Sequence, residues 1–450
     1  MRIHFIAIGG AVMHQLAINL HLNGHSVSGS DDEIFEPALS NLLKYGLIQE
    51  NNFFWNENKI TKSIDLVILG MHARIDNPEL LQAQKLGIKI VSFPEFVYLQ
   101  SKNKKRIVIG GSHGKTTITS MIMHVLKQLG KNFDYLVGSR VNGFDVMVSL
   151  SEKNDIIIIE GDEYLSSCLD RRPKFHHYMP DIAVLSGIEW DHINVFPEFE
   201  QYVQAFESYI NYVPNDGSII YTADDKNVEK LIANYSGKAE LIPYKALEYE
   251  ADGEDVNICF NSKQVKVNVF GEHNMKNLSA ALEVCRKIGI SDKDFFQSIS
   301  NFHGAAKRLE LIYNKDGLKI FRDFAHAPSK LKATVKAVKK QFEDSQLIAV
   351  FELHTFSSMN LNFLPQYSSA LDEADVAIVY FSNHAFELKR IKPFTAEEIK
   401  NGFSKNNLMV INDKESLISA VRDNFKGNSI LLLMSSGSFD NIKIEDFFSE

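Results

Sequence analysis

The amino-acid sequence predicts an α/β fold arranged as three domains in series. Its 450 residues are enough for about three domains of ordinary size. Short apolar strands alternate with helical stretches along most of the chain, a pattern typical of parallel sheets covered by helices. A glycine-rich turn within residues 107–117 joins one such strand to a helix. We expect domains over residues 1–103, 104–307 and 308–450.

The first domain is predicted from four short apolar segments with helical stretches between them. The expected strands are Ile3–Ile8, Ser26–Ser28, Leu66–Leu69 and Lys89–Ser92. The helical stretches, such as Met13–Leu22 and Leu39–Tyr45, have apolar residues at helical spacing. The polar stretch Ser101–Arg106 follows and marks a natural domain boundary.

The second and third domains repeat this alternation. Further strands are expected at Ile107–Ile109, Ile156–Ile159, Ile182–Ser186, Ser218–Tyr221, Lys319–Phe321, Leu347–Phe351, Val376–Tyr380, Met409–Ile411 and Ser429–Met434. The stretch Asn234–Lys266 carries glycine, lysine and asparagine and predicts a small antiparallel insertion. A helix after Asn274 is expected to close the second domain.

The most informative segment is IVIGGSHGKTT, residues 107–117. A strand that breaks into glycines and restarts as a helix leaves backbone N–H groups pointing at one place, where they bind phosphate oxygens. Lys115 would contact the outer phosphates of a nucleoside triphosphate, and the Thr116 hydroxyl would contact a magnesium ion. The candidate residues are Gly111, Ser112, His113, Gly114, Lys115, Thr116 and Thr117. The loop is shorter than the general pattern, and the alternative is a glycine turn that precedes a lysine by chance.

Carboxylates follow other strands of the second domain, at the sheet edge where ligands bind in open α/β sheets. Glu160 ends one apolar strand and is expected to hold magnesium, with a solvated acidic turn as the alternative. Asp191 and His192 follow another strand. A metal-binding or acid–base role is considered for His192, with a structural hydrogen bond as the alternative.

Further polar residues lie at helix starts and strand ends. Asn274 and Asn277 are about one helical turn apart and could contact an adenine edge or cap the helix. Asp323 follows a strand of the third domain and could accept hydrogen bonds from ribose hydroxyls or cap the next helix. Arg308 lies at the second domain boundary, from which an arginine could reach a terminal phosphate.

The first domain carries a second glycine turn. Gly9 and Gly10 follow its first strand, and Ser30 and Asp31 follow its second. Taken alone, this arrangement suggests a dinucleotide site and a nicotinamide-dependent oxidoreductase. The match is incomplete, because Ala7 stands where the full pattern has glycine.

Composition limits the expected partners and the compartment. The net charge of −9 argues against nucleic acid or an anionic membrane as a partner. The three cysteines are widely spaced, without a metal or disulfide pattern, which fits a reducing compartment. The sequence opens on a strand-like segment without a leader, and its apolar runs are too short to cross a bilayer. We expect a cytoplasmic protein that acts on small molecules as a monomer or weak homo-oligomer.

Taken in order, these motifs resemble those of the ATP-dependent Mur ligases of peptidoglycan synthesis over essentially the whole chain. The matching segments are GSHGKTT at 111–117, Glu160 with Asp162 and Glu163, Trp190-Asp191-His192, His273-Asn274-Met275-Lys276-Asn277, Arg308-Leu309-Glu310 and Asp323-Phe324-Ala325-His326-Ala327-Pro328. The resemblance implies a Rossmann-like UDP-sugar-binding domain, a central P-loop ATPase domain and a Rossmann-like peptide-binding domain. It also implies an amide ligase that uses ATP and Mg²⁺ and forms an acyl phosphate.

The same resemblance implies roles for residues in all three domains. The implied catalytic residues are Lys115, Glu160 and His192, and the implied magnesium ligands are Thr116, Glu160 and His192. The implied ATP contacts outside the loop are Asn274 and Asn277 for adenine, Asp323 for the ribose and Arg308 for the phosphates. The implied UDP contacts are Gly9, Gly10, Ser30 and Asp31.

Two branches of this family join UDP-N-acetylmuramate to different acceptors. One adds L-alanine, and the other, the murein peptide ligases, adds the recycled tripeptide L-alanyl-γ-D-glutamyl-meso-diaminopimelate. Residues 160–180, EGDEYLSSCLDRRPKFHHYMP, resemble the peptide-adding branch, whereas the alanine-adding branch has a shorter, serine-bearing segment. We therefore expect a peptide ligase of peptidoglycan recycling. The alternatives are L-alanine addition and, from another class, a non-catalytic nucleotide-sugar sensor.

Contacts with the peptide or the sugar are expected from side chains in the second and third domains. The candidates are Asp170, Arg172, Lys174, His326 and His354. His354 is a departure, because the family usually carries an arginine in this loop.

Overall fold

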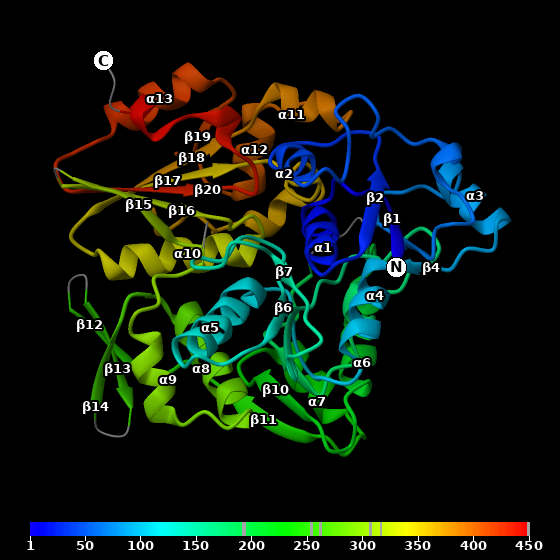
Figure 1. Ribbon diagram of the computed structural model, residues 1–450. Helices are drawn as coiled ribbons and strands as arrows, with labels where there is room; N and C mark the ends of the chain where they lie inside the picture. Colours follow the sequence, from blue (N-terminus) through cyan, green and yellow to red (C-terminus); the bar gives the residue numbers. More distant parts are fainter. Residues whose placement is uncertain (191–194, 253–254, 261–262, 306–307, 316, 448–450) are drawn as a thin grey trace. The chain divides into compact units, whose positions relative to one another are not determined.

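The computed structural model describes residues 1–190, 195–252, 255–260, 263–305, 308–315 and 317–447. The chain divides into two compact units. The first comprises Met1–Trp190, Glu198–Lys245 and Ser279–Ser298, and the second comprises the described parts of Asp191–Pro197, Ala246–Leu278 and Ile299–Glu450. Strands and helices alternate throughout, which confirms the predicted α/β class (Figure 1). Among the described residues, none of the helices has the length and apolar character needed to cross a bilayer.

A parallel four-stranded sheet with the order β2-β1-β3-β4 forms the start of the first unit. Its strands are β1 (Arg2–Ile6), β2 (Ser26–Ser30), β3 (Leu66–Leu69) and β4 (Ile90–Ser92). The helices are α1 (Ala11–Leu22), α2 (Ala38–Lys44), η1 (Glu57–Lys59), α3 (Pro78–Lys85) and α4 (Phe93–Ser101). The four expected strands are confirmed, and β3 has the expected bounds.

A seven-stranded sheet with the order β11-β10-β9-β5-β8-β6-β7 lies in the same unit. Its strands are β5 (Lys105–Gly110), β6 (Asp134–Leu136), β7 (Val148–Ser149), β8 (Ile156–Glu160), β9 (Ile182–Leu185), β10 (Ser218–Thr222) and β11 (Glu240–Tyr244). The helices are α5 (Lys115–Gln128), η2 (Lys174–His177), α6 (Phe199–Asn211) and α7 (Lys226–Ala233). Strand β5 lies between β8 and β9, and α5 packs against β5 and β8. The phosphate-loop motif therefore follows the central strand of this sheet.

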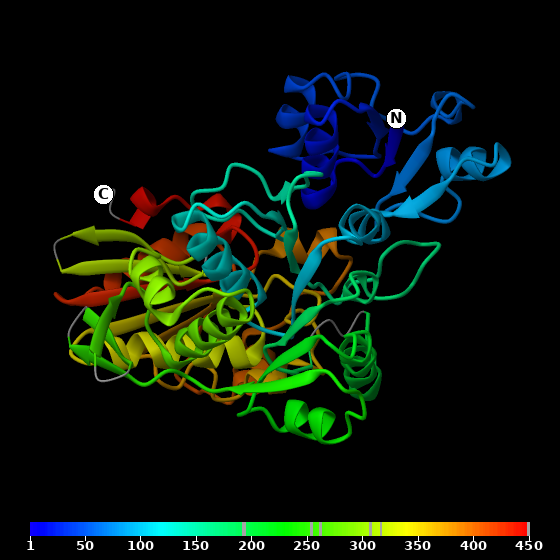
Figure 2. The same cartoon turned by 60° about the horizontal axis from the view of Figure 1, so that its bottom comes forward.

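A small antiparallel sheet, β12-β13-β14, confirms the predicted insertion (Figures 1 and 2). Its strands are β12 (Tyr249–Asp252), β13 (Asp255–Phe260) and β14 (Lys263–Val267). The insertion is shorter than expected, because β11 pairs with β10 in the seven-stranded sheet. The helices α8 (Glu272–Lys287) and α9 (Asp292–Ile299) follow.

The second unit contains a six-stranded sheet with the order β15-β16-β20-β17-β18-β19, parallel except for β15. Its strands are β15 (Glu310–Lys315), β16 (Leu318–Asp323), β17 (Gln346–Glu352), β18 (Val376–Tyr380), β19 (Met409–Ile411) and β20 (Ser429–Met434). The helices are α10 (Pro328–Gln341), η3 (Leu364–Tyr367), α11 (Asn383–Leu388), α12 (Ala396–Phe403), α13 (Lys414–Asp423), η4 (Phe439–Asn441) and η5 (Ile444–Phe447). One face packs against α10 and α12, and the opposite face packs against α13.

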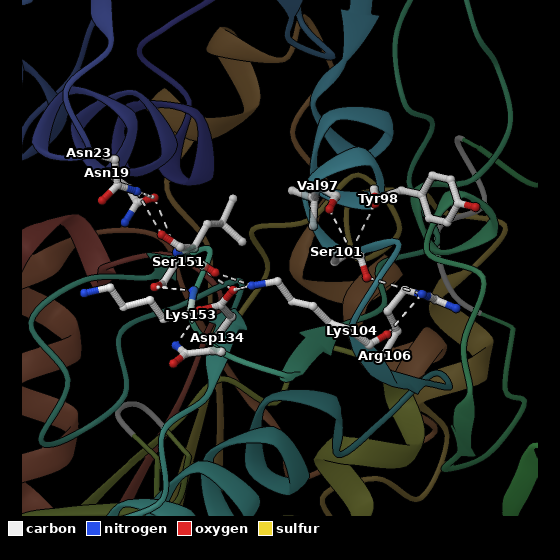
Figure 3. Close-up of polar contacts among 12 residues, drawn as sticks. Asn19, Asn23, Val97, Tyr98, Ser101, Lys104, Arg106, Asp134, Ser151 and Lys153 are labelled. Carbon is white, nitrogen blue, oxygen red and sulfur yellow. Dashed lines mark hydrogen bonds and ion pairs between the residues drawn. The ribbon is translucent and has the colours of Figure 1, made fainter.

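The polar stretch between α4 and β5 is tightly held, as Figure 3 shows. Lys104 crosses to the buried Asp134, with Nζ 2.5 Å from Oδ2, and also donates to the Ser151 carbonyl. The adjacent Leu150 carbonyl accepts a hydrogen bond of 2.9 Å from Asn23 at the end of α1. Lys104 and Asn23 therefore contact neighbouring residues, Ser151 and Leu150, directly after β7.

Candidate active site

The phosphate-loop motif forms the connection between β5 and α5, as the sequence predicts. Gly111 has φ +123° and Gly114 has φ +79°, which are conformations that residues with a side chain rarely adopt. A Cβ at Gly111 would lie 2.3 Å from the Ser186 Oγ. Glycine is therefore required here both by the backbone conformation and by the close approach of the β9 end.

Side chains around the loop hold its backbone in place. Ser112 Oγ donates to the Glu189 carbonyl at 2.8 Å and lies 2.9 Å from the buried Tyr202 hydroxyl. Ser186 Oγ donates to the His113 carbonyl, and His113 Nε2 lies 2.9 Å from Glu189 Oε2. The loop is thus fixed to the segment that follows β9, which preorganises its N–H groups for an anion.

Lys115 begins α5 and forms an ion pair with Glu163. Its Nζ lies 2.8 and 2.9 Å from the two Glu163 carboxylate oxygens and donates to the Gly111 carbonyl at 2.7 Å. Burial alone lowers the pKa of Lys115, but Glu163, Asp162 and Glu160 together raise it above its ordinary value. Lys115 therefore keeps its positive charge beside the loop. The pairing with Glu163 was not among the sequence predictions.

Glu160 ends β8 beside the loop, also as predicted. Its Oε1 accepts a hydrogen bond of 2.6 Å from the Thr116 hydroxyl, and its Oε2 accepts one of 2.8 Å from the Gly138 N–H. Burial raises the pKa of Glu160, and Asp162 adds to this rise. The buried Thr117 follows in the first turn of α5.

The oxygen atoms at this position fit a magnesium ion. Thr116 and Glu160 offer a hydroxyl and a carboxylate, and Mg²⁺ is usually held by one or two carboxylates together with nucleotide phosphates and waters. Within the described ranges, no three or more His, Cys, Asp and Glu side chains lie together as metal ligands. A metal site made of protein side chains alone would need such a group. His192, the third predicted ligand, lies outside the described residues together with Asp191.

The glycine turn of the first domain brings together all four of its candidate residues. Gly9 donates its N–H to Asp31 Oδ2 at 2.7 Å, and Gly10 immediately precedes α1. The carbonyl of Ser30 accepts the Ala7 N–H at 2.9 Å. Ala7 has φ +66°, so this alanine adopts the conformation for which the general pattern uses glycine.

Asp31 has an unusual environment for a carboxyl group. It is 5% exposed, and burial raises its pKa to about 7, although the Gly9 N–H works in the opposite direction. Its protonation therefore changes near neutral pH.

The segment that follows β8 contains a cluster of charged residues. Arg172 donates from Nη2 to Asp170 Oδ2 at 2.6 Å, and His177 Nε2 lies 3.2 Å from the same oxygen. The hydrogen bonds from Arg172 hold the pKa of Asp170 below its usual value. Burial lowers the pKa of His177 to about 4, so this imidazole is neutral at physiological pH. Lys174 lies apart from this cluster, 3.6 Å from Asp162.

The remaining ATP candidates lie in the second unit. The Asn274 side chain donates to the Phe270 carbonyl at 2.9 Å, and the Asn277 amide lies 3.3 Å from Asn274 Oδ1. Asp323 accepts the Leu309 and Ala325 N–H groups at 2.6 and 2.7 Å. The Arg308 guanidinium stacks on the Phe324 ring at 4.5 Å. Each is therefore held by its own neighbours, and their joint contact with a nucleotide stays a prediction.

The two candidate histidines of the third domain lie at the ends of different strands. His326 Nδ1 lies 2.9 Å from the Phe324 carbonyl after β16. His354 follows β17, with its Nδ1 3.9 Å from Glu352 Oε1. Glu352 was not predicted as a site residue. Its signal is visible in the sequence, because it ends an apolar strand in the same way as Glu160.

The fold and the loop together define a P-loop nucleotide-binding enzyme, since Lys115, Thr116 and Glu160 converge at the end of the central strand of a parallel sheet. Comparison with known families gives the more particular assignment. Residues 2–105 match the family described as "Mur ligase family, catalytic domain", residues 109–285 match "Mur ligase middle domain", and residues 307–437 match "Mur ligase, glutamate ligase domain".

Individual relatives agree with these matches. A UDP-N-acetylmuramate–L-alanine ligase of Caldicellulosiruptor bescii is 31% identical over 409 residues, which cover 88% of this chain and 86% of the relative. The UDP-N-acetylmuramate–L-alanyl-γ-D-glutamyl-meso-2,6-diaminoheptandioate ligase of Escherichia coli K12 is 31% identical over 364 residues, which cover 78% and 79%. The crystal structure of a murein peptide ligase from Psychrobacter arcticus has a TM-score of 0.64 at 26% identity, covering 98% of this chain and 97% of that one.

The chain belongs to the Mur ligase family. The predicted family, the three α/β domains in series and the class of ATP-dependent amide ligase acting in peptidoglycan metabolism are thereby confirmed. The oxidoreductase alternative is set aside. More of the matched relatives are named as L-alanine ligases than as peptide ligases, so the comparisons leave the acceptor open.

Proposed function

We propose that this enzyme joins UDP-N-acetylmuramate to the recycled tripeptide L-alanyl-γ-D-glutamyl-meso-diaminopimelate. The observation that carries the proposal is the segment after β8, where the Asp170–Arg172 ion pair and the neutral His177 imidazole form one polar cluster. This segment resembles the peptide-adding branch of the family and is longer than its counterpart in the alanine-adding branch. A tripeptide acceptor carries more charged groups than L-alanine does. Polar side chains such as Asp170 and Arg172 could bind these additional groups.

The proposed reaction has two steps, each with balanced atoms. A carboxylate oxygen of the sugar acid attacks the terminal phosphorus of ATP, ADP leaves, and an acyl phosphate forms. The free amine of the peptide then attacks the acyl carbon, phosphate leaves with the former carboxylate oxygen, and the nitrogen loses a proton. A carboxylate resists amines because its oxygen leaves poorly, and phosphorylation supplies a good leaving group.

Residues of the candidate site have distinct proposed roles in this sequence. The N–H groups of residues 111–114 and the Lys115 ammonium would bind the phosphates and offset the charge of the transferred phosphoryl group. Thr116 and Glu160 would hold Mg²⁺, which when bound neutralises phosphate charge. Gly9, Gly10, Ser30 and Asp31 would hold the UDP portion, and the second-unit residues the adenosine.

A substrate panel tests the proposal. Purified enzyme receives ATP, Mg²⁺ and UDP-N-acetylmuramate, with either the tripeptide or L-alanine as the acceptor, and ADP formation is measured. We expect a higher kcat/KM for the tripeptide. A higher kcat/KM for L-alanine would replace this proposal with L-alanine addition. That alternative is favoured by the L-alanine ligases, whose sequence identity to this chain is similar to that of the peptide ligase.

A further inference from the structure

The centre of the six-stranded sheet has the geometry of a ligand site. After β17 the chain packs on the face covered by α10, through Met359 and Leu364. After the adjacent β20 it packs on the opposite face, through Phe439 beside α13. Segments that leave neighbouring strands toward opposite faces open a crevice at the carboxyl ends of those strands, and open α/β sheets bind ligands there.

A buried carboxylate with one unused oxygen lies at this position. Glu352, the last residue of β17, is 2% exposed. Its Oε2 accepts hydrogen bonds from the Ser435 hydroxyl and from the Phe439 N–H, the latter at 3.1 Å. Within the part of the chain that the structure describes, its Oε1 accepts none, and His354 Nδ1 lies 3.9 Å from it. A largely buried carboxyl group with an oxygen that accepts no hydrogen bond is stabilised when a ligand supplies a donor.

His354 does not supply the missing charge. Burial lowers the pKa of His354, and Lys389 acts in the same direction, so the imidazole is neutral at physiological pH. Its Nδ1 is buried without a hydrogen-bond partner among the described residues, and so is the nearby Ser436 Oγ on the β20 side. Glu352 Oε1, His354 Nδ1 and Ser436 Oγ are thus three polar atoms at the ends of two adjacent strands that lack partners in the described chain.

Lys389, directly after α11, carries a charge opposite to that of Glu352, but the two side chains do not form an ion pair in the described chain. Burial raises the pKa of Glu352 and lowers that of Lys389, and each group opposes this shift in the other, but no ion pair within 4 Å joins them in the described ranges. The Lys389 ammonium instead lies 5.6 Å from the centre of the Phe356 ring. Lys389 therefore influences both Glu352 and His354 without contacting Glu352 in the described chain.

The backbone around the crevice is held in an uncommon conformation. Phe439, Asp440 and Asn441 have φ values of +50°, +50° and +59°, which are left-handed conformations in three consecutive residues with side chains. This turn places the Phe439 N–H on Glu352 and the Asp440 carboxylate 2.5 Å from the Tyr380 hydroxyl. Strain of this kind persists where the surrounding structure imposes it, and it is frequent at binding sites.

We propose that Glu352 and Lys389 form a specificity subsite for a zwitterionic amino-acid head group, with its ammonium on Glu352 and its carboxylate on Lys389. The inference rests on the proposed function, and in that context the head group is the free end of the diaminopimelate residue, which carries both charges on one carbon. His354 and Ser436 supply further hydrogen bonds to the same group. Gly437 is required beside them, because a Cβ there would lie 2.6 Å from His354 Nδ1.

Four tripeptides with different third residues separate the two charges. Diaminopimelate presents both charges, lysine presents the ammonium alone, 2-aminopimelate presents the carboxylate alone, and 2-aminoheptanoate presents neither. KM and kcat are measured for each peptide with wild-type enzyme, Glu352→Gln and Lys389→Met. The matched controls are Glu387→Gln and Lys392→Met, which change exposed residues of the same region.

The proposal predicts a charge-specific pattern. Glu352→Gln raises KM about tenfold or more for the diaminopimelate and lysine peptides and leaves KM for the other two unchanged. Lys389→Met raises KM by a similar factor for the diaminopimelate and 2-aminopimelate peptides only. The KM for ATP, the KM for the sugar nucleotide and the kcat at saturating peptide stay within about twofold in both variants.

Equal changes for all four peptides, or no change for any, would overturn the subsite. If Glu352→Gln fails to fold, as thermal unfolding would show, the Lys389→Met series decides by the same criterion, since Lys389 is half-buried after a helix end. Failure of the proposed function is a separate result, because wild-type enzyme would then prefer L-alanine to every peptide.

Discussion

Replacement of Lys115 by alanine separates two contributions that this residue makes to the candidate site. The ammonium contacts both carboxylate oxygens of Glu163, whose side chain is 1% exposed. Removal of one member of a buried ion pair costs about 3–5 kcal/mol, because the remaining charge stays out of water. The same change removes the cation proposed to contact the phosphates of ATP.

The size of the stability loss is measurable. For a domain of about 150–250 residues, each kcal/mol lowers Tm by about 2–4 °C, so Lys115→Ala is expected to lower the Tm of the transition that includes the P-loop domain by about 6–20 °C. ADP release in the presence of all substrates is expected to fall to background. Binding of the UDP-sugar is expected to persist at a temperature where the variant is folded, because its candidate residues surround a different glycine turn.

The double variant Lys115→Ala, Glu163→Gln provides the matched control. It removes both buried charges, so most of the lost Tm should return, whereas ADP release should stay at background because the lysine is still missing. The measurements are thermal unfolding and a coupled ADP assay. The reasoning is refuted if Lys115→Ala retains turnover, or if Glu163→Gln in that background restores activity or leaves the stability loss unchanged.

Three further perturbations test other parts of the account. Gly111→Ala should abolish ATP binding, measured by calorimetry, because the added Cβ would lie 2.3 Å from a serine oxygen. The control Gly130→Ala, at φ +64° with open space around it, should cost only about 1–2 kcal/mol of stability and keep ATP binding. Equal effects of the two variants on ATP binding would contradict the steric argument. Burial raises the pKa of Asp31 to about 7, so its folded form binds a proton more readily than its unfolded form, and stability from this group is lost as pH rises from about 4 to about 7. Asp31→Asn should therefore lose less stability than wild type between pH 4 and 7 in urea unfolding, and parallel pH profiles would exclude the raised pKa. Thr116→Val should raise the Mg²⁺ concentration for half-maximal activity while Thr116→Ser should not, and unchanged Mg²⁺ dependence of the valine variant would remove Thr116 from the metal site.

Much of the fold could be predicted because the chain's strands are apolar runs bounded by polar residues. Strands β3, β18, β19 and β20 have the expected bounds, since each is a short apolar run in a parallel sheet, although the residues of β19 are only partly buried. The short strands β6 and β7 were not predicted. Their two or three residues give no periodic signal, and β7 is defined by its antiparallel pairing with β6.

The candidate site could be predicted where one local motif carries it. The loop, Lys115 and Glu160 come together because the strands that precede them, β5 and β8, are neighbours in the sheet. The Lys115–Glu163 pair was missed because it joins residues 48 positions apart through the fold. Glu352 was missed although it ends an apolar strand in the same way as Glu160, because its hydrogen bonds come from Ser435 and Phe439, which lie far along the chain.

Transfer of a labelled oxygen tests the central claim most directly. The sugar acid is prepared with ¹⁸O in its carboxylate, and the released inorganic phosphate is analysed by mass spectrometry after amide formation. The account predicts one ¹⁸O atom per labelled carboxylate in the phosphate, because the acyl phosphate passes that oxygen to the leaving group. Accumulation of amide with unlabelled phosphate would contradict it.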